Sequence, residues 1–235
     1  MAPQDTQTAA FLQGEGDAWF GRNRGALTGK ESYFECDLIT GELAPFHEGI
    51  SDLLEIGCGD GHKAELLARF FGARAAGIDP SQEAIAHGLQ RLEGRIDAPA
   101  VDLRVATADR LPFADASFDL VYFGFCLYLV GRSQLLSAVA EADRVLRSGG
   151  FLAILDFDPP QRMRRAYHHR PGLYSYKQDY ASMFTATGAY QLFGKRSFSH
   201  SGQHFSRDPQ ERVAMSFLYK DPDPYLPAAP QGSGT

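Results

Sequence analysis

The amino-acid sequence predicts an α/β fold: a mostly parallel sheet of about seven strands with helices on both faces and a C-terminal antiparallel strand pair. Two observations support this prediction. Between residues 52 and 157, short apolar segments alternate with amphipathic stretches. After residue 187, this alternation gives way to two strand-like runs with few breaks between them. Strands that alternate with helices build a parallel sheet that is covered on both faces.

Each element of the sheet region has its own pattern. The expected strands are residues 52–56, 75–78, 101–105, 118–123 and 151–157. Residues 101–105 alternate apolar and polar side chains, as a half-buried strand does. The expected helices are residues 62–71, 80–92 and 133–147, and Gly149-Gly150 would end the last of them.

The two ends of the chain differ from this middle region. A helix is expected over residues 177–187, followed by strands over 190–198 and 212–219. We divide the chain into an N-terminal helical cap (1–50), a main domain (51–221) with an insertion at about 158–180, and a disordered tail (222–235). The cap contains a helix-like segment, residues 11–27, that would lie over the mouth of the sheet.

Composition excludes several classes of protein. With 44% apolar residues, the 235-residue chain can bury one sizeable core. A net charge of −6 argues against nucleic acid as a partner. Three widely spaced cysteines suggest neither a disulfide framework nor a zinc ribbon. Without a signal peptide or a long apolar run, we expect a cytoplasmic protein, monomeric or homodimeric, that does not bind membranes.

The strongest local signal is the turn after the first strand, Gly57-Cys58-Gly59-Asp60-Gly61. Glycines there permit a sharp turn and close approach of a ligand to the backbone. A dinucleotide fingerprint requires another glycine at position 62, where this chain has His62, so an oxidoreductase is disfavoured.

Asp79 ends the second expected strand, 22 positions after Gly57. From that place an acidic side chain reaches the hydroxyls of a bound ribose. A second interpretation stays open: Asp79 could be a helix N-cap, with Pro80 as the first helical residue.

Further motifs follow in a fixed order. These are Asp109 before Leu111-Pro112-Phe113, then Phe118-Asp119-Leu120-Val121, then Leu146-Arg147-Ser148-Gly149-Gly150. Together with Glu55, the glycine turn and Asp79, they resemble the class I S-adenosylmethionine-dependent methyltransferases, especially the group similar to ubiquinone and menaquinone biosynthesis methyltransferases. The resemblance covers roughly residues 50–157 and implies a Rossmann-like domain with S-adenosyl-L-methionine as cofactor. Asp119 is expected to be structural, because it begins the fourth strand.

The resemblance also implies which residues contact the cofactor. They are Glu55, Gly57, Cys58, Gly59, Gly61, Asp79, Pro80, Asp109, Arg110, Leu111, Phe123 and Phe125. The glycine turn would meet the methionine part, with Glu55 toward its ammonium group, and Asp109 would meet the adenine. Phe123 and Phe125 stand where many relatives have small polar residues, which predicts an unusually apolar acceptor pocket. In the N-terminal segment, Arg22 is the candidate for contact with the cofactor.

The acceptor would be bound by segments that cover the strand ends. Residues 162–180 concentrate arginine, histidine and tyrosine, which suit an anionic small molecule. The candidates for catalysis are His168, His169, Tyr176 and Lys177. The alternative is a solvated charged turn whose aromatic residues pack on the sheet. His200, His204 and Glu211 match no metal-binding spacing, so no metal is expected.

We therefore predict an enzyme that transfers a methyl group from S-adenosylmethionine to oxygen or nitrogen of a small molecule. A peptide or protein side-chain methyltransferase and a catalytically silent cofactor-binding subunit are the alternatives. Asp158-Pro159-Pro160 superficially resembles a motif of enzymes that methylate base amines, but Gln161 follows it and a rigid exit turn is preferred.

Overall fold

A computed structural model describes residues 7–225. Its centre is a seven-stranded sheet in the order β3-β2-β1-β4-β5-β9-β8. The strands are β1 (Asp52–Ile56), β2 (Arg74–Asp79), β3 (Val101–Val105), β4 (Phe118–Gly124), β5 (Leu146–Phe157), β8 (Tyr190–Ser199) and β9 (Arg212–Lys220). Strands β1 to β5 pair in parallel, whereas β9 pairs antiparallel with both β5 and β8. The predicted fold class, including its terminal antiparallel pair, is confirmed.

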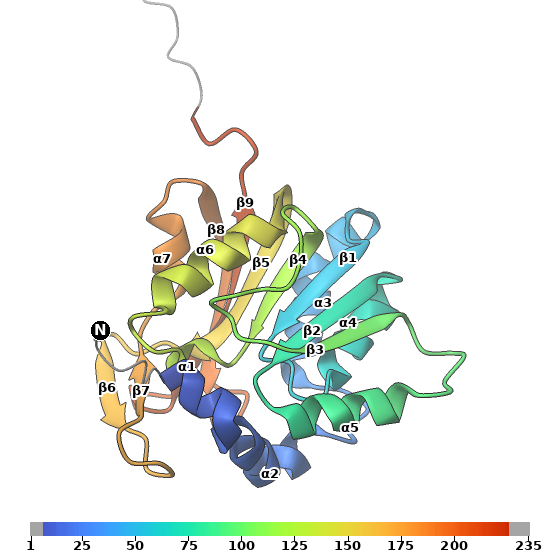
Figure 1. Cartoon of the computed structure of the whole chain (residues 1–235). Helices are drawn as coiled ribbons and strands as arrows, with labels where there is room; N and C mark the ends of the chain where they lie inside the picture. Colours follow the sequence, from blue (N-terminus) through green and yellow to red (C-terminus); the bar gives the residue numbers. More distant parts are fainter. Residues whose placement is uncertain (1–6, 226–235) are drawn as a thin grey trace, which may run out of the picture.

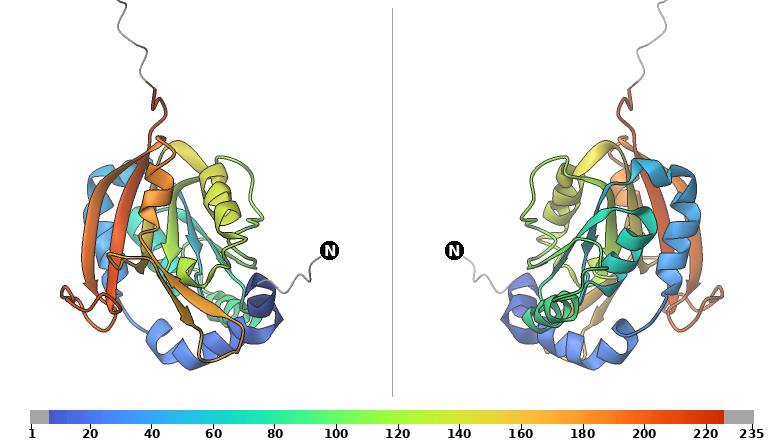
Figure 2. Two further views of the ribbon diagram at one scale, coloured as in Figure 1. Left: turned by 90° about the vertical axis from the view of Figure 1, so that its left-hand side faces the viewer. Right: turned by 90° about the vertical axis from the view of Figure 1, so that its right-hand side faces the viewer.

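Helices cover both faces of this sheet (Figure 2). α3 (Phe34–Leu43) and α4 (His62–Phe71) pack on one face, where Leu43 and Leu67 are fully buried against Leu53. α6 (Leu135–Val145) and α7 (Ala181–Thr185) pack on the other, where Ala138 meets Val121. α5 (Gln82–Leu92) covers β2 and β3. Each face of the sheet therefore has its own apolar core.

The N-terminal helices lie across the carboxyl ends of the parallel strands (Figure 1). α1 (Gln7–Ala10), a π-helical turn (Phe11–Glu15) and α2 (Gly16–Leu27) are continuous except for a kink at Gly14. Beside them stands a two-stranded ribbon, β6 (Met163–Ala166) with β7 (Tyr174–Lys177). Both segments therefore cover the edge of the sheet at which open α/β folds bind ligands.

The insertion and the N-terminal segment are joined by direct hydrogen bonds. The side-chain amide nitrogen (Nε2) of Gln7 donates to the carbonyl oxygens of Leu129 and Tyr174, at 2.5 and 2.7 Å. Its amide oxygen accepts from the backbone of Tyr174, and Arg170 donates to the carbonyl oxygen of Ala10. Segments far apart in the sequence thus form one cover.

Three elements differ from the predictions. Lys177 does not begin a helix: it ends β7, and the helix that follows spans only Ala181–Thr185, because cross-strand pairing captures residues 174–177. The helix expected over 133–147 ends at Val145, and Leu146 already pairs with Phe118. Gly149-Gly150 lies inside β5, where pairing with β4 is interrupted, with Gly149 at φ +80°.

Two further elements were not anticipated. α3 and the short 3₁₀ helix Ala44–Gly49 occupy part of the cap for which no element was predicted. The expected disorder of residues 222–235 concerns mostly positions outside the described residues. None of the helices within residues 7–225 has the length and apolar character needed to cross a membrane.

Candidate cofactor and acceptor site

The glycine turn after β1 adopts a backbone that other residues would strain. Gly57, Gly59 and Gly61 have φ values of +79°, +56° and +72°. A Cβ atom on Gly57 would lie 2.7 Å from the Cβ of Cys126. The backbone nitrogens of Gly57 and Cys58 both donate to the carbonyl oxygen of Ile78, which ties the turn to β2. Only glycine can leave this surface open to a ligand.

Asp79 lies at the end of β2 and faces the same turn. Its carboxylate accepts hydrogen bonds from the backbone nitrogens of Gly59 (3.0 Å) and Ser81 (2.9 Å). Burial is the main cause that raises the pKa of Asp79 to about 6, and the two backbone hydrogen bonds oppose it. The helix-cap interpretation of Asp79 and Pro80 is wrong: Ser81 is the N-cap of α5, accepting from the backbone nitrogen of Ala84, and the helix begins at Gln82.

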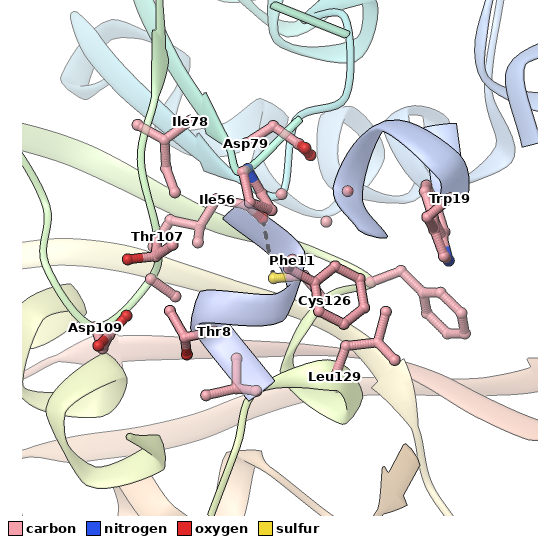
Figure 3. A pocket seen from close by; sticks show the side chains of 17 residues that line it. Thr8, Phe11, Trp19, Ile56, Ile78, Asp79, Thr107, Asp109, Cys126 and Leu129 are labelled. Atoms are coloured by element: carbon pink, nitrogen blue, oxygen red, sulfur yellow. Dashed lines mark hydrogen bonds between the residues drawn. The ribbon is translucent and has the colours of Figure 1, made fainter. Parts of the chain in front are cut away.

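A narrow pocket lies between these strand ends and the N-terminal helices (Figure 3). Asp79 and Asp109 stand on its walls, and Thr8, Phe11 and Trp19 close it from the helices. Pro80, Thr107 and Ala108 complete the side next to β2 and β3. Carboxylates with apolar walls suit a ribose joined to a flat ring. We call this space the cofactor pocket.

A larger cleft of about 740 Å³ adjoins the cofactor pocket. The two share Trp19, Gly57, Gly124 and Phe125 as walls. The cleft extends to the β6–β7 ribbon and to the loop between β8 and β9. Phe125 has φ +62°, a conformation rare for a bulky residue and found mostly where function requires it. We call this second space the acceptor cleft.

Several predicted cofactor residues line one of the two spaces. Gly57, Asp79, Pro80, Asp109 and Phe125 line the cofactor pocket. Arg22, Cys58 and Gly59 line the acceptor cleft next to the shared wall. The guanidinium of Arg22 also pairs with Glu15 at 2.5 Å and donates to the hydroxyl of Tyr167 at 2.8 Å.

Glu55 does not line either space, contrary to the prediction. Its side chain is fully buried on the core side of the turn, where Lys63 approaches it at 3.5 Å. Burial, only partly offset by Lys63, raises the pKa of Glu55 to about 7. A Cβ on Gly124 would lie 2.7 Å from its Oε1, so Glu55 supports the shared wall from beneath.

Four other predicted residues also point elsewhere. Phe123 is fully buried in the core beside Phe184. Leu111 is buried, and its backbone nitrogen donates to Glu141, whereas Arg110 is exposed. Gly61 faces Leu103, whose Cδ2 would lie 2.5 Å from a Cβ at that position. Strand alternation alone would turn Phe123 and Phe125 to the same face of the sheet. β4 ends at Gly124, however, and Phe125 lies beyond it with φ +62°, so its ring lines the two spaces while Phe123 stays in the core.

The candidate catalytic residues divide in the same way. His168, His169 and Lys177 line the acceptor cleft, and the two histidines are exposed at its rim. Tyr176 lies outside it, because its neighbour Lys177 turns inward; the guanidinium of Arg132 lies 4.2 Å from the Tyr176 ring centroid. Asp119 has the structural surroundings expected: it accepts from the backbone nitrogens of Ser51 and Asp52 and pairs with Arg147 at 2.7 Å.

His200 is the main cleft residue that sequence reasoning missed. It was considered only as a metal ligand, and no cluster of three metal-binding side chains occurs among residues 7–225. Its ring stacks on Phe125, with centroids 5.3 Å apart and planes 19° apart. Asp156, which lines neither space, is a buried carboxylate that sequence reasoning did not select: it accepts from the backbone nitrogens of Tyr128 and Phe157, and burial raises its pKa to about 8. Its position at the end of β5 was the available signal.

Comparison with known proteins finds a match for the middle of the chain. A model described as "Methyltransferase domain" matches residues 54–154. The chain is 34% identical over 115 residues to the ubiquinone/menaquinone biosynthesis C-methyltransferase UbiE of Desulfotalea psychrophila, covering 48% of this chain and 44% of that protein. It is 39% identical over 107 residues to methyltransferase GfsG of Streptomyces halstedii, covering 44% of this chain and 37% of that protein. The match to such curated relatives spans about half of their length or less.

Solved structures extend the likeness of fold to nearly the whole chain. A Burkholderia thailandensis 1,6-didemethyltoxoflavin-N1-methyltransferase superposes with a TM-score of 0.68 at 16% identity, covering 94% of this chain and 93% of that one. The N-methyltransferase NodS of Bradyrhizobium japonicum gives a TM-score of 0.57 at 18% identity, covering 86% of this chain and 97% of that one. Residues 54–154 therefore match a methyltransferase domain, and the solved structures show that nearly the whole chain shares the fold of such enzymes.

Proposed function

We propose that this protein transfers the methyl group of S-adenosylmethionine to an oxygen or nitrogen atom of a small molecule that carries an anionic group. The observation that supports the proposal most strongly is the shared wall between two spaces. Trp19, Gly57, Gly124 and Phe125 border both the cofactor pocket and the acceptor cleft. A methyl donor on one side and an acceptor on the other would meet at this wall.

The residues around the cofactor pocket fit the proposed donor. Asp79 would accept hydrogen bonds from the ribose hydroxyls, since it lines the pocket and its pKa of about 6 leaves it mostly ionised at neutral pH. Thr107, Ala108 and Asp109 would contact the adenine. The open backbone of Gly57 and Gly59 would face the methionine part. Arg22, which lines the same cleft as this turn, would bind the methionine carboxylate through donors that Glu15 and Tyr167 leave free.

Methyl transfer requires little covalent chemistry from the protein itself. The sulfonium methyl is already electrophilic, so the enzyme aligns the acceptor for in-line attack and, where necessary, removes its proton. The N-terminal helices (residues 7–27) and the insertion (158–180) would exclude water by closing over both spaces, because Gln7 and Arg170 tie them together. The acceptor would contact His168, His169 and Lys177. Tyr176 would not contact it, because its ring lies outside the cleft.

Calorimetry tests the cofactor assignment. S-adenosylhomocysteine should bind, and NAD should not. Asp79→Ala should weaken S-adenosylhomocysteine binding by about 1.5–3 kcal/mol, the range for a hydrogen bond to a charged group. The matched control is Ser81→Ala, which removes the true N-cap of α5 and should lower the free energy of unfolding by about 1 kcal/mol while cofactor affinity is kept. Tight NAD binding, or equal cofactor affinity in wild type and Asp79→Ala, would contradict the assignment.

A panel of small phenols, amines and carboxylic acids tests the acceptor class. Production of S-adenosylhomocysteine is measured with each compound in turn. Methylation of at least one phenol or amine supports the proposal. A protein that binds S-adenosylhomocysteine yet methylates none of the panel would favour the silent subunit, and methylation of peptides alone would favour the protein methyltransferase.

A further inference from the structure

Lys177 is a buried cation on the wall of the acceptor cleft. Lys177 is the last residue of β7, and it is only 8% exposed. Its Nζ lies 3.6 Å from the ring centroid of Phe157 and donates to the carbonyl oxygen of Gln210 at 2.6 Å. Among the described residues, every ion pair of a lysine involves Lys63, Lys195 or Lys220 and none involves Lys177. Burial is the largest cause that lowers the pKa of Lys177; Arg165 lowers it further, whereas Glu211, Asp208 and Asp156 oppose this. Because an unpaired buried charge is costly, an ammonium with no carboxylate at ion-pair distance would be stabilised by a bound anion.

His200 reaches the same end of the cleft from the loop after β8. Its ring lies 5.4 Å from that of Phe157, on which Lys177 also packs, and 5.3 Å from that of Phe125. Phe125 belongs to the shared wall. His200 is therefore beside the place where a methyl group would pass, and Lys177 stands close to it.

The charges around His200 favour its neutral form. Burial is the largest cause that lowers the pKa of His200, and the positive charge of Lys177 lowers it further, whereas Glu211 opposes both. Phe125 and Phe157, which pack against the ring, carry no charge. A histidine with a lowered pKa is unprotonated near neutral pH, so it can accept a proton.

Four other residues of the cleft lining are apolar or aromatic, whereas Arg165, Ser175 and Glu211 add polar groups to it. Tyr128, Leu155, Phe198 and Val213 are all buried residues that line it. Flat, apolar walls beside the Lys177 cation and the His200 base suit an aromatic ring that bears a weakly acidic hydroxyl.

We propose that the acceptor is a phenol, that His200 removes its proton, and that Lys177 binds the resulting phenolate oxygen. The inference rests on the proposed methyltransferase function and names its substrate class. Lys177 supplies the charge that stabilises the oxygen as the proton leaves, and Phe125 holds the His200 ring at the shared wall.

The step is balanced. The phenol O–H bond breaks, and its proton goes to the free ring nitrogen of His200. The oxygen lone pair forms a bond to the methyl carbon of the donor as the carbon–sulfur bond breaks. The sulfur keeps the bonding pair, which leaves a neutral thioether and an aryl methyl ether, and the imidazolium then loses its proton to water.

The first test follows ionisation of a bound phenol and requires no cofactor. The probe is 4-nitrophenol, whose phenolate absorbs at longer wavelength than the neutral form. Wild-type protein should lower the pKa of bound 4-nitrophenol by about 1 unit or more, as an opposite charge within a few ångströms does. Lys177→Met should abolish the shift, Lys177→Arg should restore part of it, and the matched control Lys195→Met, outside the cleft, should keep it whole.

The second test separates a base from a structural residue. His200→Gln should lower kcat by about 100-fold or more for weakly acidic phenols such as 4-methylphenol, the usual range for general-base catalysis. The loss should shrink for acidic phenols such as 4-nitrophenol, which ionise without help. The wild-type rate should fall as pH drops through the pKa of His200, and this fall should disappear in His200→Gln. A merely structural role would lower kcat equally for all phenols.

Three outcomes would overturn the inference: 4-nitrophenol that does not bind, 4-nitrophenol that binds with an unshifted pKa, or a loss in His200→Gln that is independent of phenol acidity. Binding of S-adenosylhomocysteine to the same preparations reports separately on the proposed function. If the cofactor binds and phenols fail, only the substrate class is wrong. Thermal unfolding of each variant shows whether it is folded.

Discussion

The two halves of the site are built in different ways. The cofactor pocket draws its polar groups from the turn after β1, from Asp79 and from residues 107–109, all of which follow strands of one parallel sheet. The acceptor cleft draws its polar groups from α2 near the start of the chain and from β7 and the loop between β8 and β9 in its last third. The first half is therefore local in sequence and set by backbone geometry, whereas the second exists only after distant segments have packed.

This difference predicts which substitutions impair each half of the site. A turn made of positive-φ glycines loses its function through backbone strain at one position. A cleft made of separate side chains loses parts of its function one residue at a time. Variants in the two halves should consequently separate cofactor affinity from acceptor turnover.

The largest effect is expected for Gly57→Val. A Cβ there would collide with Cys126 at 2.7 Å, and the φ of +79° is unfavourable for a β-branched residue. Calorimetry should show cofactor binding weakened by at least about 3 kcal/mol, together with a lower melting temperature. Gly72→Ala is the matched control: its φ of +62° is similar, but nothing lies within 4 Å. It should lose about 1 kcal/mol of stability and keep its affinity. Cofactor affinity equal to that of the wild type in Gly57→Val would show that the cofactor half does not depend on the backbone of this turn.

A smaller effect is expected on the acceptor side. His168→Gln and His169→Gln, tested with whichever panel compound is methylated, should each reduce kcat/KM by roughly 0.5–1.5 kcal/mol in transition-state stabilisation. Cofactor affinity should stay unchanged, since both lie at the rim of the cleft. Tyr176→Phe is the control and should match wild type, because its ring packs on Arg132 outside the cleft. Reduced cofactor affinity in either histidine variant would show that the halves are not separable.

The last effect concerns stability rather than binding or turnover. Burial raises the pKa of Asp156 to about 8, so the folded state binds a proton that the unfolded state releases at lower pH. The sign follows: this group contributes stability at acidic pH that is lost as the pH rises toward 8, by at most about 1.4 kcal/mol per pH unit. Asp156→Asn removes the titration but keeps an oxygen for only one of the two backbone nitrogens, because Tyr128 and Phe157 donate to different carboxylate oxygens.

Denaturant unfolding at pH 5 and pH 8 measures this dependence. Asp156→Asn should unfold with a smaller difference between the two pH values than wild type. Glu141→Gln is a suitable control, because Arg144 is the main cause that lowers the pKa of Glu141, which gives the opposite sign. Equal pH dependence in wild type and Asp156→Asn would show that Asp156 is ionised in the folded protein.

The sequence by itself determined the parallel sheet and the cofactor half of the site. Alternating apolar and amphipathic segments specify strands and helices locally, and a strand followed by glycines places a turn at the sheet edge without knowledge of the rest. Asp79 and Asp109 could be selected for the same reason, since the carboxyl ends of parallel strands all meet at one edge. Where prediction failed in this half, at Glu55, Leu111 and Phe123, the side chains turn into the core, which spacing alone does not show.

Only the tertiary structure decided the acceptor half. Lys177 was placed in a helix by its local pattern, yet pairing between β6 and β7 turns it into the cleft and Tyr176 away from it. His200 acquires a role only because the loop after β8 stacks it on Phe125, which is 75 positions earlier in the chain. Side chains from distant segments meet through the packing of the whole sheet and its cover, and that packing is not encoded in any one stretch of sequence.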